Sequence, residues 1–189
     1  MKLLICGDSF SFDHQHPQSW VTQLSSYADV VNLSQCGCSE YKIKQQLESI
    51  DVTEFDKIFV FHTSPSRLYL GQPNPLAVKS THINSDLVFS DVEEKRYTHE
   101  LARIAYEYYV NIYDKKYYEY VHSLICADID SQTKHLDVVH FTNFDYTGLY
   151  NFGNNLINFY SVWAKNKGNI NHYSVRGNKV LLEKILKLL

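Results

Sequence analysis

The first third of the chain alternates short apolar runs with amphipathic segments, and this alternation restricts the fold more than any other feature. The apolar runs comprise residues 2–6, 29–33 and 57–61. They are rich in branched or aromatic side chains, as expected of strands that are buried on both faces. The amphipathic segments comprise residues 19–27 and 39–50, which begin at Ser19 and Ser39 as plausible N-caps. Strands that alternate with helices predict a parallel sheet covered by helices on both faces.

The rest of the chain continues this pattern around two irregular segments. The further elements predicted are helices over residues 91–130 with a break near 113–116, a strand at 136–141 and an amphipathic helix at 174–189. The irregular segments are residues 64–91, which hold every proline except Pro17, and residues 145–158. Loops of that length in compact domains are often functional. We therefore predict one domain over residues 1–189, an α/β/α sandwich of three layers with a parallel, flavodoxin-like sheet of about five strands.

Charge and hydropathy exclude several classes of protein. The formal net charge is −3 and no run of Lys or Arg is present, which argues against binding to nucleic acid. No segment approaches the roughly 20 apolar residues of a membrane helix. The apolar start of the chain stops at Gly7 and Asp8, too early for a secretory signal. No glycine-rich phosphate loop is present. We therefore expect a cytoplasmic protein with no membrane span, no nucleic-acid partner and no cofactor.

The cysteines fit the same compartment. Cys36 and Cys38 are separated by a single residue, too tightly for the usual redox or zinc pair. Cys6 and Cys126 complete no disulfide framework. We predict four buried, reduced thiols.

Polar residues follow the first three predicted strands. They lie in residues 7–10, 34–39 and 62–67, and the carboxyl ends of parallel strands share the edge of the sheet at which ligands bind. Ser9 is among them, and a serine hydroxyl needs a base within hydrogen-bond reach to act as a nucleophile. His172, just before the last predicted helix, is the candidate base.

These segments resemble the sequence blocks of the SGNH (GDSL-like) hydrolase superfamily over almost the whole chain. The GDSF sequence around Ser9 matches the nucleophile block, and Gly37 matches the oxyanion-hole glycine of the second block. Ser64 falls at the asparagine of the third block, and Asn169 and His172 fall at the aspartate and histidine of the last. The resemblance implies a serine esterase or acylhydrolase acting on a small-molecule, lipid or acetylated-glycan ester. Ser9, His172 and Asn169 would be catalytic, and Gly37 and Ser64 would hold the oxyanion.

The chain departs from the family pattern at four positions. His62, Ser64 and Pro65 replace the glycine, asparagine and aspartate of the third block, and Asn169 replaces the final aspartate. Loss of one oxyanion donor typically costs about 100- to 1000-fold in turnover. An asparagine in place of the orienting aspartate costs about 10⁴-fold in the serine-protease template. The alternative is therefore a catalytically weak or inactive binding module for a glycan or small molecule on the same fold.

The remaining polar candidates each have a structural and a functional interpretation. Arg67 pairs with an acidic neighbour or binds a substrate anion, and Asp8 is expected to make structural hydrogen bonds. His14 and His16 have an HxH spacing, but no matching carboxylate or cysteine partner is evident, so no metal site is predicted. The tyrosine-rich residues 106–120 are expected mostly to pack helices, with some rings beside the cleft.

Overall fold

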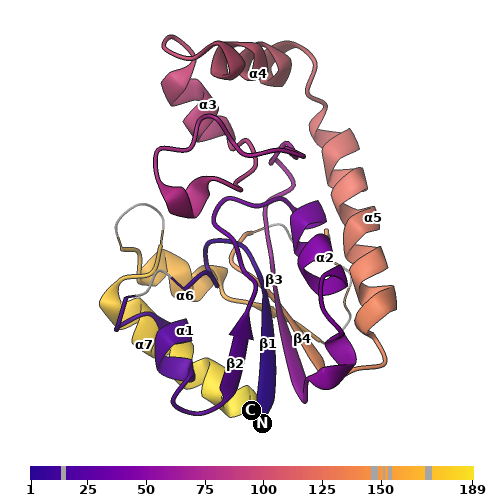
Figure 1. The fold of residues 1–189 in the computed structure, drawn as a ribbon, viewed down its shortest axis with the longest axis vertical. Coiled ribbons are helices and arrows are strands. Elements are labelled where there is room, and N and C mark those ends of the chain that lie inside the picture. The colour runs from indigo at the N-terminus through magenta and orange to yellow at the C-terminus, as the bar shows by residue number, and fades with distance from the viewer. Residues whose placement is uncertain (14–15, 146–148, 151, 153–154, 169–171) are drawn as a thin grey trace.

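Five parallel strands form a single sheet in the order β2-β1-β3-β4-β5 in the computed structural model (Figure 1). The structure describes residues 1–13, 16–145, 149–150, 152, 155–168 and 172–189. The strands are β1 (Lys2–Gly7), β2 (Asp29–Asn32), β3 (Lys57–His62), β4 (Val138–Thr142) and β5 (Leu156–Asn158). This strand order is the flavodoxin-like one, so the predicted fold class is confirmed.

Helices cover both faces of the sheet (Figure 1). One face carries α1 (Trp20–Leu24), α6 (Tyr160–Lys165) and α7 (Val175–Ile185), and the other carries α2 (Glu40–Glu48) and α5 (Lys115–Thr133). Helices α3 (Phe89–Lys95) and α4 (Glu100–Asn111) lie beyond the carboxyl ends of the strands. Short 3-10 helices are η1 (Val52–Glu54), η2 (Ser80–His82) and η5 (Leu186–Leu188).

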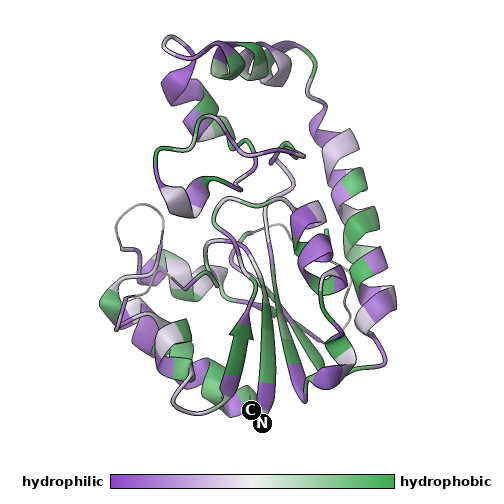
Figure 2. Ribbon diagram, viewed as in Figure 1, coloured by the Kyte–Doolittle hydropathy of each residue, from purple (hydrophilic) through white to green (hydrophobic). Residues whose placement is uncertain are grey.

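The alternation of side chains along each strand divides the core into two halves. Leu3 and Ile5 pack with Phe61 against α1 and α7, whereas Leu4 and Cys6 face α2 and α5. The hydrophobic strands are visible between more mixed helices in Figure 2. Burying one such large apolar side chain stabilises the fold by about 1.5–3 kcal/mol. The two-sided apolar character of the strands is therefore what places helices on both faces.

The end of β1 is held by a side chain from α2. The backbone N–H of Gly7 donates to Gln46 Oε1 (2.7 Å), and Gln46 Nε2 donates to the carbonyl of Gly7 (3.1 Å). The N–H of Gln35 donates to the same carbonyl (3.0 Å). Buried backbone groups must find partners, and here an amide side chain supplies both a donor and an acceptor. This arrangement fixes the backbone directly before Asp8 and Ser9.

Two elements and one helix break were missed by the sequence prediction. Strand β5 and helix α6 lie in or just after the segment predicted to be a surface excursion, residues 145–158. The strand has three residues and is only half-buried at the sheet edge, which leaves a weak periodic signal. Residues 91–130 contain a break between α3 and α4 as well as the predicted one between α4 and α5.

The other predicted elements are confirmed, with the helices somewhat shorter than expected. Ser19 and Ser39 stand at the N-cap positions of α1 and α2, although neither side chain makes a capping hydrogen bond with a described residue. Residues 64–91 are largely irregular, with one isolated bridge between Leu68 and Leu87. In the described part of the chain, none of the helices combines the length and the apolar character needed to cross a bilayer.

Candidate functional site

The turn after β1 sends two neighbouring polar side chains to different surroundings. Asp8 is fully buried and bonds to Thr63 and Arg67. Ser9 lines a cavity beside α1 and α7. Both residues follow the last residue of β1, in the bend and turn that end the strand, where the backbone changes direction and the two side chains separate. At the end of β1, Asp8 therefore belongs to a buried hydrogen-bond network, whereas Ser9 lines a cavity.

Ser9 and His172 line the same cavity, which has a volume of about 660 Å³. We refer to it as the Ser9 cavity. Its walls come from the turn after β1, the start of α1 and the segment that leads into α7. Aromatic side chains, among them Phe12, Trp20 and Tyr173, form much of the lining. The first and last parts of the chain thus meet at one site, as the sequence predicted they would have to for catalysis.

Hydrogen bonds join residues 166–168 to residues 172–174, which lead into α7. The N–H of Gly168 donates to the carbonyl of His172 (2.7 Å), and the N–H of Ser174 donates to the carbonyl of Asn166 (2.8 Å). The Ser174 hydroxyl accepts from the N–H of Gly177 (3.1 Å) and caps α7. Capping by serine typically stabilises a helix by about 1 kcal/mol. The backbone of His172 is therefore fixed to the start of the helix.

Phe10 lines the Ser9 cavity and contacts His172. Its ring lies 5.8 Å from the ring of His172 and 5.9 Å from that of Tyr173, measured between centroids. Its carbonyl accepts from the indole N–H of Trp20 (3.0 Å). The Tyr173 hydroxyl donates to Asn143 Oδ1. Packed aromatic rings with bonded polar ends restrict the motion of the cavity wall.

The other predicted site residues do not join this cavity in the described part of the structure. Ser64 lines a different cavity, and its hydroxyl lies 2.8 Å from that of Ser66. Gly37 adopts a φ of +67°, and its carbonyl accepts from the N–H of Asp86 (3.1 Å). A Cβ at Gly37 would lie 2.8 Å from the Cβ of Ser85, so the turn requires glycine. Asn169 lies outside the described residues.

Asp8 and Arg67 form a buried ion pair. Arg67 Nη2 lies 3.0 Å from Asp8 Oδ2, and the other carboxylate oxygen of Asp8 accepts from the N–H of Phe10 (2.9 Å). Burial raises the pKa of Asp8, and the Arg67 guanidinium opposes that shift. The structural interpretation of both residues is the one that the contacts favour. Of the HxH pair, His14 lies outside the described residues, and His16 lines the Ser9 cavity.

A second group of polar side chains is buried between the sheet and helices α2 and α5. We call it the α2/α5 cluster; its members are Glu40, His62, His122, Cys126 and His140. Glu40 Oε1 lies 2.6 Å from His62 Nδ1, and His62 Nε2 lies 2.9 Å from His140 Nδ1. Glu40 Oε2 accepts from the N–H of Thr63 (3.1 Å). The cluster is a continuous polar chain inside an otherwise apolar layer.

Burial and neighbouring groups perturb the ionisation of this cluster. Burial disfavours the charged form of Glu40, but His62, His122 and the bonds to His62 and Thr63 outweigh it, so the pKa of Glu40 is lowered. Burial lowers the pKa of His122, and it lowers the pKa of His140 to about 3. At neutral pH the resulting state has Glu40 as a carboxylate and His122 and His140 as neutral imidazoles.

Sequence reasoning missed this cluster, although two signals were present. His122 and Cys126 are four residues apart in a predicted helix, a spacing that places both on one face. His140 interrupts an apolar strand. Glu40 and His62 were assigned no such role because their partners are distant in sequence. The prediction for the cysteines themselves is confirmed, since all four thiols are free and buried.

Two further cavities lie near the carboxyl edge of the sheet. One, of about 420 Å³, is lined by residues that include Glu40, Ser64, Arg67, Tyr118 and His122. Tyr118, from the tyrosine-rich residues 106–120, thus lines this cavity, whereas no residue of that stretch is among the described residues that line the Ser9 cavity.

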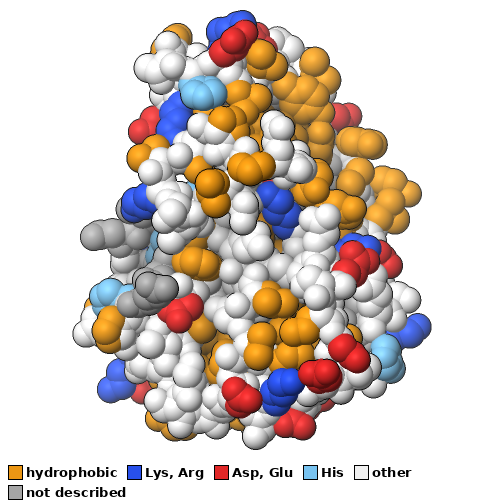
Figure 3. Space-filling model, viewed as in Figure 1, with side chains coloured by type: hydrophobic (Ala, Val, Ile, Leu, Met, Phe, Trp, Pro, Cys, Tyr) orange, Lys and Arg blue, Asp and Glu red, His pale blue; other side chains and the backbone are white. Residues whose placement is uncertain are grey.

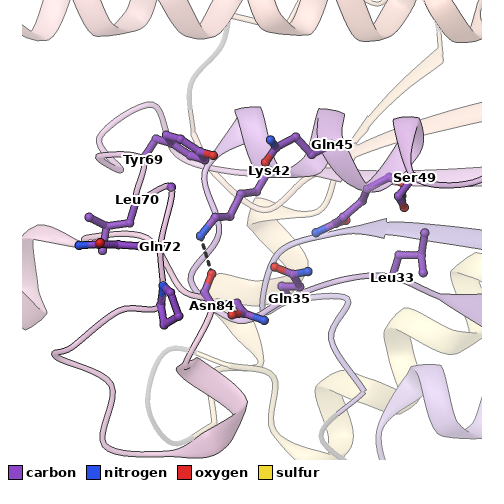
Figure 4. Close-up of a pocket in the computed structure, with 12 residues that line it drawn as sticks. Leu33, Gln35, Lys42, Gln45, Ser49, Tyr69, Leu70, Gln72 and Asn84 are labelled. Carbon is purple, nitrogen blue, oxygen red and sulfur yellow. Dashed lines mark hydrogen bonds between the residues drawn. The ribbon is translucent and has the colours of Figure 1, made fainter.

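The other cavity, of about 380 Å³, has a mixed polar and apolar lining and lies between α2 and residues 69–84 (Figure 4). Lys42 Nζ donates to the carbonyl of Asn84 in that cavity (2.6 Å) and lies 2.8 Å from the buried Asp86. The positive charge of Lys42 is thus balanced by Asp86 within the wall of the cavity.

Comparison with known proteins supports the architecture. No model of a known protein family matches the sequence, and neither does any curated protein. Among solved structures, the fold is similar to that of an acetyl xylan esterase (Est2A) from the rumen bacterium Butyrivibrio proteoclasticus, at 11% sequence identity and a TM-score of 0.50. The match covers 98% of this chain and 62% of that structure, so the chain spans less than two thirds of its neighbour. The chain shares its fold with an esterase.

Proposed function

We propose that the protein is a serine ester hydrolase of the SGNH type, with Ser9 as nucleophile and His172 as its base. The observation that carries the proposal is that Ser9 and His172, 163 positions apart, line one cavity at the carboxyl end of β1. Ligands of parallel sheets bind at that edge. The resemblance of the GDSF sequence and the fold shared with an esterase also support it.

The reaction would proceed through an acyl-enzyme. Ser9 Oγ attacks the ester carbonyl while His172 takes its proton, and His172 then returns that proton to the leaving alcohol. Water, activated by the same imidazole, hydrolyses the acyl-enzyme and restores Ser9. Backbone N–H groups at Ser9 and Gly37 and the Ser64 hydroxyl are the proposed oxyanion donors, and Asn169 is the proposed third member.

The proposed substrate is a short acyl ester of a small molecule or acetylated glycan. Aromatic rings and polar groups share the lining of the Ser9 cavity, a combination suited to an acyl group and a polar alcohol. The structural neighbour is an acetyl xylan esterase, which makes acetylated xylan a reasonable first polysaccharide to test.

The proposal is tested by hydrolysis of p-nitrophenyl acetate and by labelling with a fluorophosphonate probe. We expect the wild-type protein to hydrolyse the ester and to carry the probe on the peptide that contains Ser9, as found by mass spectrometry. Ser9→Ala should lose both properties, whereas Ser26→Ala, at an exposed serine, should keep both. Retained hydrolysis in purified Ser9→Ala would rule out this mechanism.

One observation favours a binding module as the second candidate. The described residues that line the Ser9 cavity include neither Gly37 nor Ser64, two of the three proposed oxyanion donors. A module of this kind would bind acetylated oligosaccharides without hydrolysing them. Calorimetric titration with acetylated xylo-oligosaccharide, combined with absence of fluorophosphonate labelling in folded wild-type protein, would support this function over the first.

A further inference from the structure

Three members of the α2/α5 cluster bring metal-binding atoms together. Glu40, His122 and Cys126 each offer one such atom, and these atoms lie within 4.8 Å of one another. His122 Nε2 lies 3.7 Å from Glu40 Oε2. Ligand–metal distances of about 2.0–2.3 Å in tetrahedral zinc sites imply separations of about 3.3–3.8 Å between ligand atoms. A small contraction of side chains would therefore complete such a geometry.

The imidazole of His122 has an unused nitrogen directed into this group. Its side chain is 4% exposed, and no hydrogen-bond partner for Nε2 is found among the described residues. A buried polar atom without a partner costs about 1–3 kcal/mol. A cation bound at this nitrogen would remove that cost.

Further hydrogen bonds fix the orientation of the Glu40 carboxylate. His62 contacts one carboxylate oxygen (2.6 Å) and is itself bonded to His140, while the N–H of Thr63 donates to the other oxygen (3.1 Å). Such outer partners fix the orientation of metal-ligating groups in proteins. Arg67, which lines the same cavity as Glu40, is already paired with Asp8. The local charge therefore leaves the carboxylate able to accept a cation.

The three side chains come from two helices that cover the same face. Glu40 begins α2, and His122 and Cys126 lie one turn apart on α5. Glu40 and His122 also line the cavity of about 420 Å³. That cavity gives a route for entry and space for water at a fourth coordination position.

We propose that Glu40, His122 and Cys126 bind a divalent cation of the zinc class. The donor set of oxygen, nitrogen and sulfur suits Zn²⁺ and its substitute Co²⁺ better than Mg²⁺ or Ca²⁺, which prefer oxygen alone. On binding, Cys126 loses its thiol proton to solvent through the cavity, and the sulfur coordinates as thiolate. The site lies on the opposite face of the sheet from the Ser9 cavity, and the cation supplies no group to the proposed ester hydrolysis.

The test uses Co²⁺ because a cobalt–thiolate bond has a charge-transfer absorption in the near ultraviolet. Wild-type protein is treated with a chelator, dialysed and titrated with Co²⁺, and Zn²⁺ is then added to displace it. We expect one equivalent of Co²⁺ to produce the band and Zn²⁺ to abolish it. Absence of the band in protein that is folded by circular dichroism would overturn the proposal.

Matched variants identify the ligands. Cys126→Ser should lose the charge-transfer band, whereas Cys36→Ser, at a buried cysteine outside the cluster, should keep it. The opposite pattern, or a band that survives in Cys126→Ser, would overturn the assignment. X-ray absorption of the cobalt-loaded wild type gives a check that needs no variant: we expect one sulfur ligand and at least one imidazole. A shell of oxygen alone would contradict the site.

Discussion

The two faces of the sheet at its carboxyl edge carry different kinds of polar chemistry. On the α1/α7 face, Ser9 and His172 line an accessible cavity with aromatic walls. On the α2/α5 face, Glu40, His122 and Cys126 are buried among hydrogen-bonded histidines. A hydroxyl and an imidazole that line a cavity suit reaction with a ligand that enters from solvent. A buried group of oxygen, nitrogen and sulfur donors suits retention of an ion. Asp8 and Ser9, which are adjacent at the end of β1, thus lie in different surroundings.

The surface beyond that edge differs from both faces. Hydrophobic side chains gather over α4 and the upper part of α5 in Figure 3. Exposed members of this group include Ile104, Val110, Ile112, Tyr117 and Leu124. Inside the same region, Tyr108 and Tyr118 join their hydroxyls at 2.6 Å. Tyrosines of this stretch therefore join the end of α4 to the start of α5, in line with the packing role predicted from the sequence.

The largest expected effect is a loss of hydrolysis that arises on the α1/α7 face and leaves the α2/α5 face unchanged. We expect His172→Ala to reduce kcat/KM for p-nitrophenyl acetate on the order of 10⁴- to 10⁶-fold, because the nucleophile loses its base. The cobalt titration of the α2/α5 cluster should be unchanged. His135→Ala, at an exposed histidine, serves as the control and should retain wild-type activity. Near-normal hydrolysis by His172→Ala would remove the catalytic role from this face.

The second effect concerns Asp8, which lies next to Ser9 in sequence but on the other side of the turn. Asp8→Ala should lower the free energy of unfolding by about 3–5 kcal/mol, because Arg67 is left buried without its partner. Urea denaturation measures this change. Asp137→Ala removes an ion pair in which the carboxylate is 58% exposed, and should cost less than about 1 kcal/mol.

Asp8→Asn provides a sharper version of that test. If Asp8 is structural, the folded fraction of this variant should still react with the fluorophosphonate at Ser9. Loss of labelling in a folded sample would show that Asp8 contributes to the chemistry and that the two environments are not separate.

The third effect is a dependence of stability on pH that originates on the α2/α5 face. The pKa of His140 is lowered to about 3 in the folded protein by burial and by His62, whereas an unfolded histidine titrates near about 6.5. The unfolded state therefore binds more protons between these values. Stability should fall as the pH decreases through this window, by up to about 1.4 kcal/mol per pH unit for one histidine.

Urea denaturation at several pH values between neutral and mildly acidic conditions measures this slope. We expect His140→Asn to reduce the slope and His135→Asn, at the exposed position, to leave it unchanged. Equal slopes in wild type and His140→Asn would contradict the assignment of acid sensitivity to this face.

The smallest effect tests the turn at Gly37. Gly37→Ala should destabilise the protein by about 1–3 kcal/mol, because the residue has a φ of +67° and its new Cβ would press on Ser85. Gly71→Ala is the control, since a Cβ there would meet only ordinary contacts at 3.6 Å or more. A difference of less than about 0.5 kcal/mol between the two variants would contradict this explanation.

The sequence predicted most of the fold because its local signals agree with the tertiary structure. Strands β1, β2, β3 and β4 are apolar runs with clear ends, and their alternation with helices determines the parallel sheet. Strand β5 was missed because a short, half-buried edge strand has little periodicity. This strand is recognised by its pairing with β4 at the edge of the sheet, a tertiary contact that its own sequence does not indicate.

The site was predicted unevenly for a related reason. Ser9 and His172 could be selected because each follows or precedes a recognisable element. The α2/α5 cluster could not, because it is assembled from α2, β3, β4 and α5, and its contacts join residues 22 and 78 positions apart. Only the spacing of His122 and Cys126 on one helix was visible locally.

The two hydrogen bonds between Gln46 and Gly7 connect the two faces of the sheet. Helix α2 carries Glu40 at its start and, through Gln46, holds the backbone that leads into Ser9. If a bound cation drew α2 toward α5, these hydrogen bonds would transmit the movement to Gly7, two residues before Ser9. Thermodynamic reciprocity then requires that occupancy of the Ser9 cavity change the affinity for the cation by the same factor.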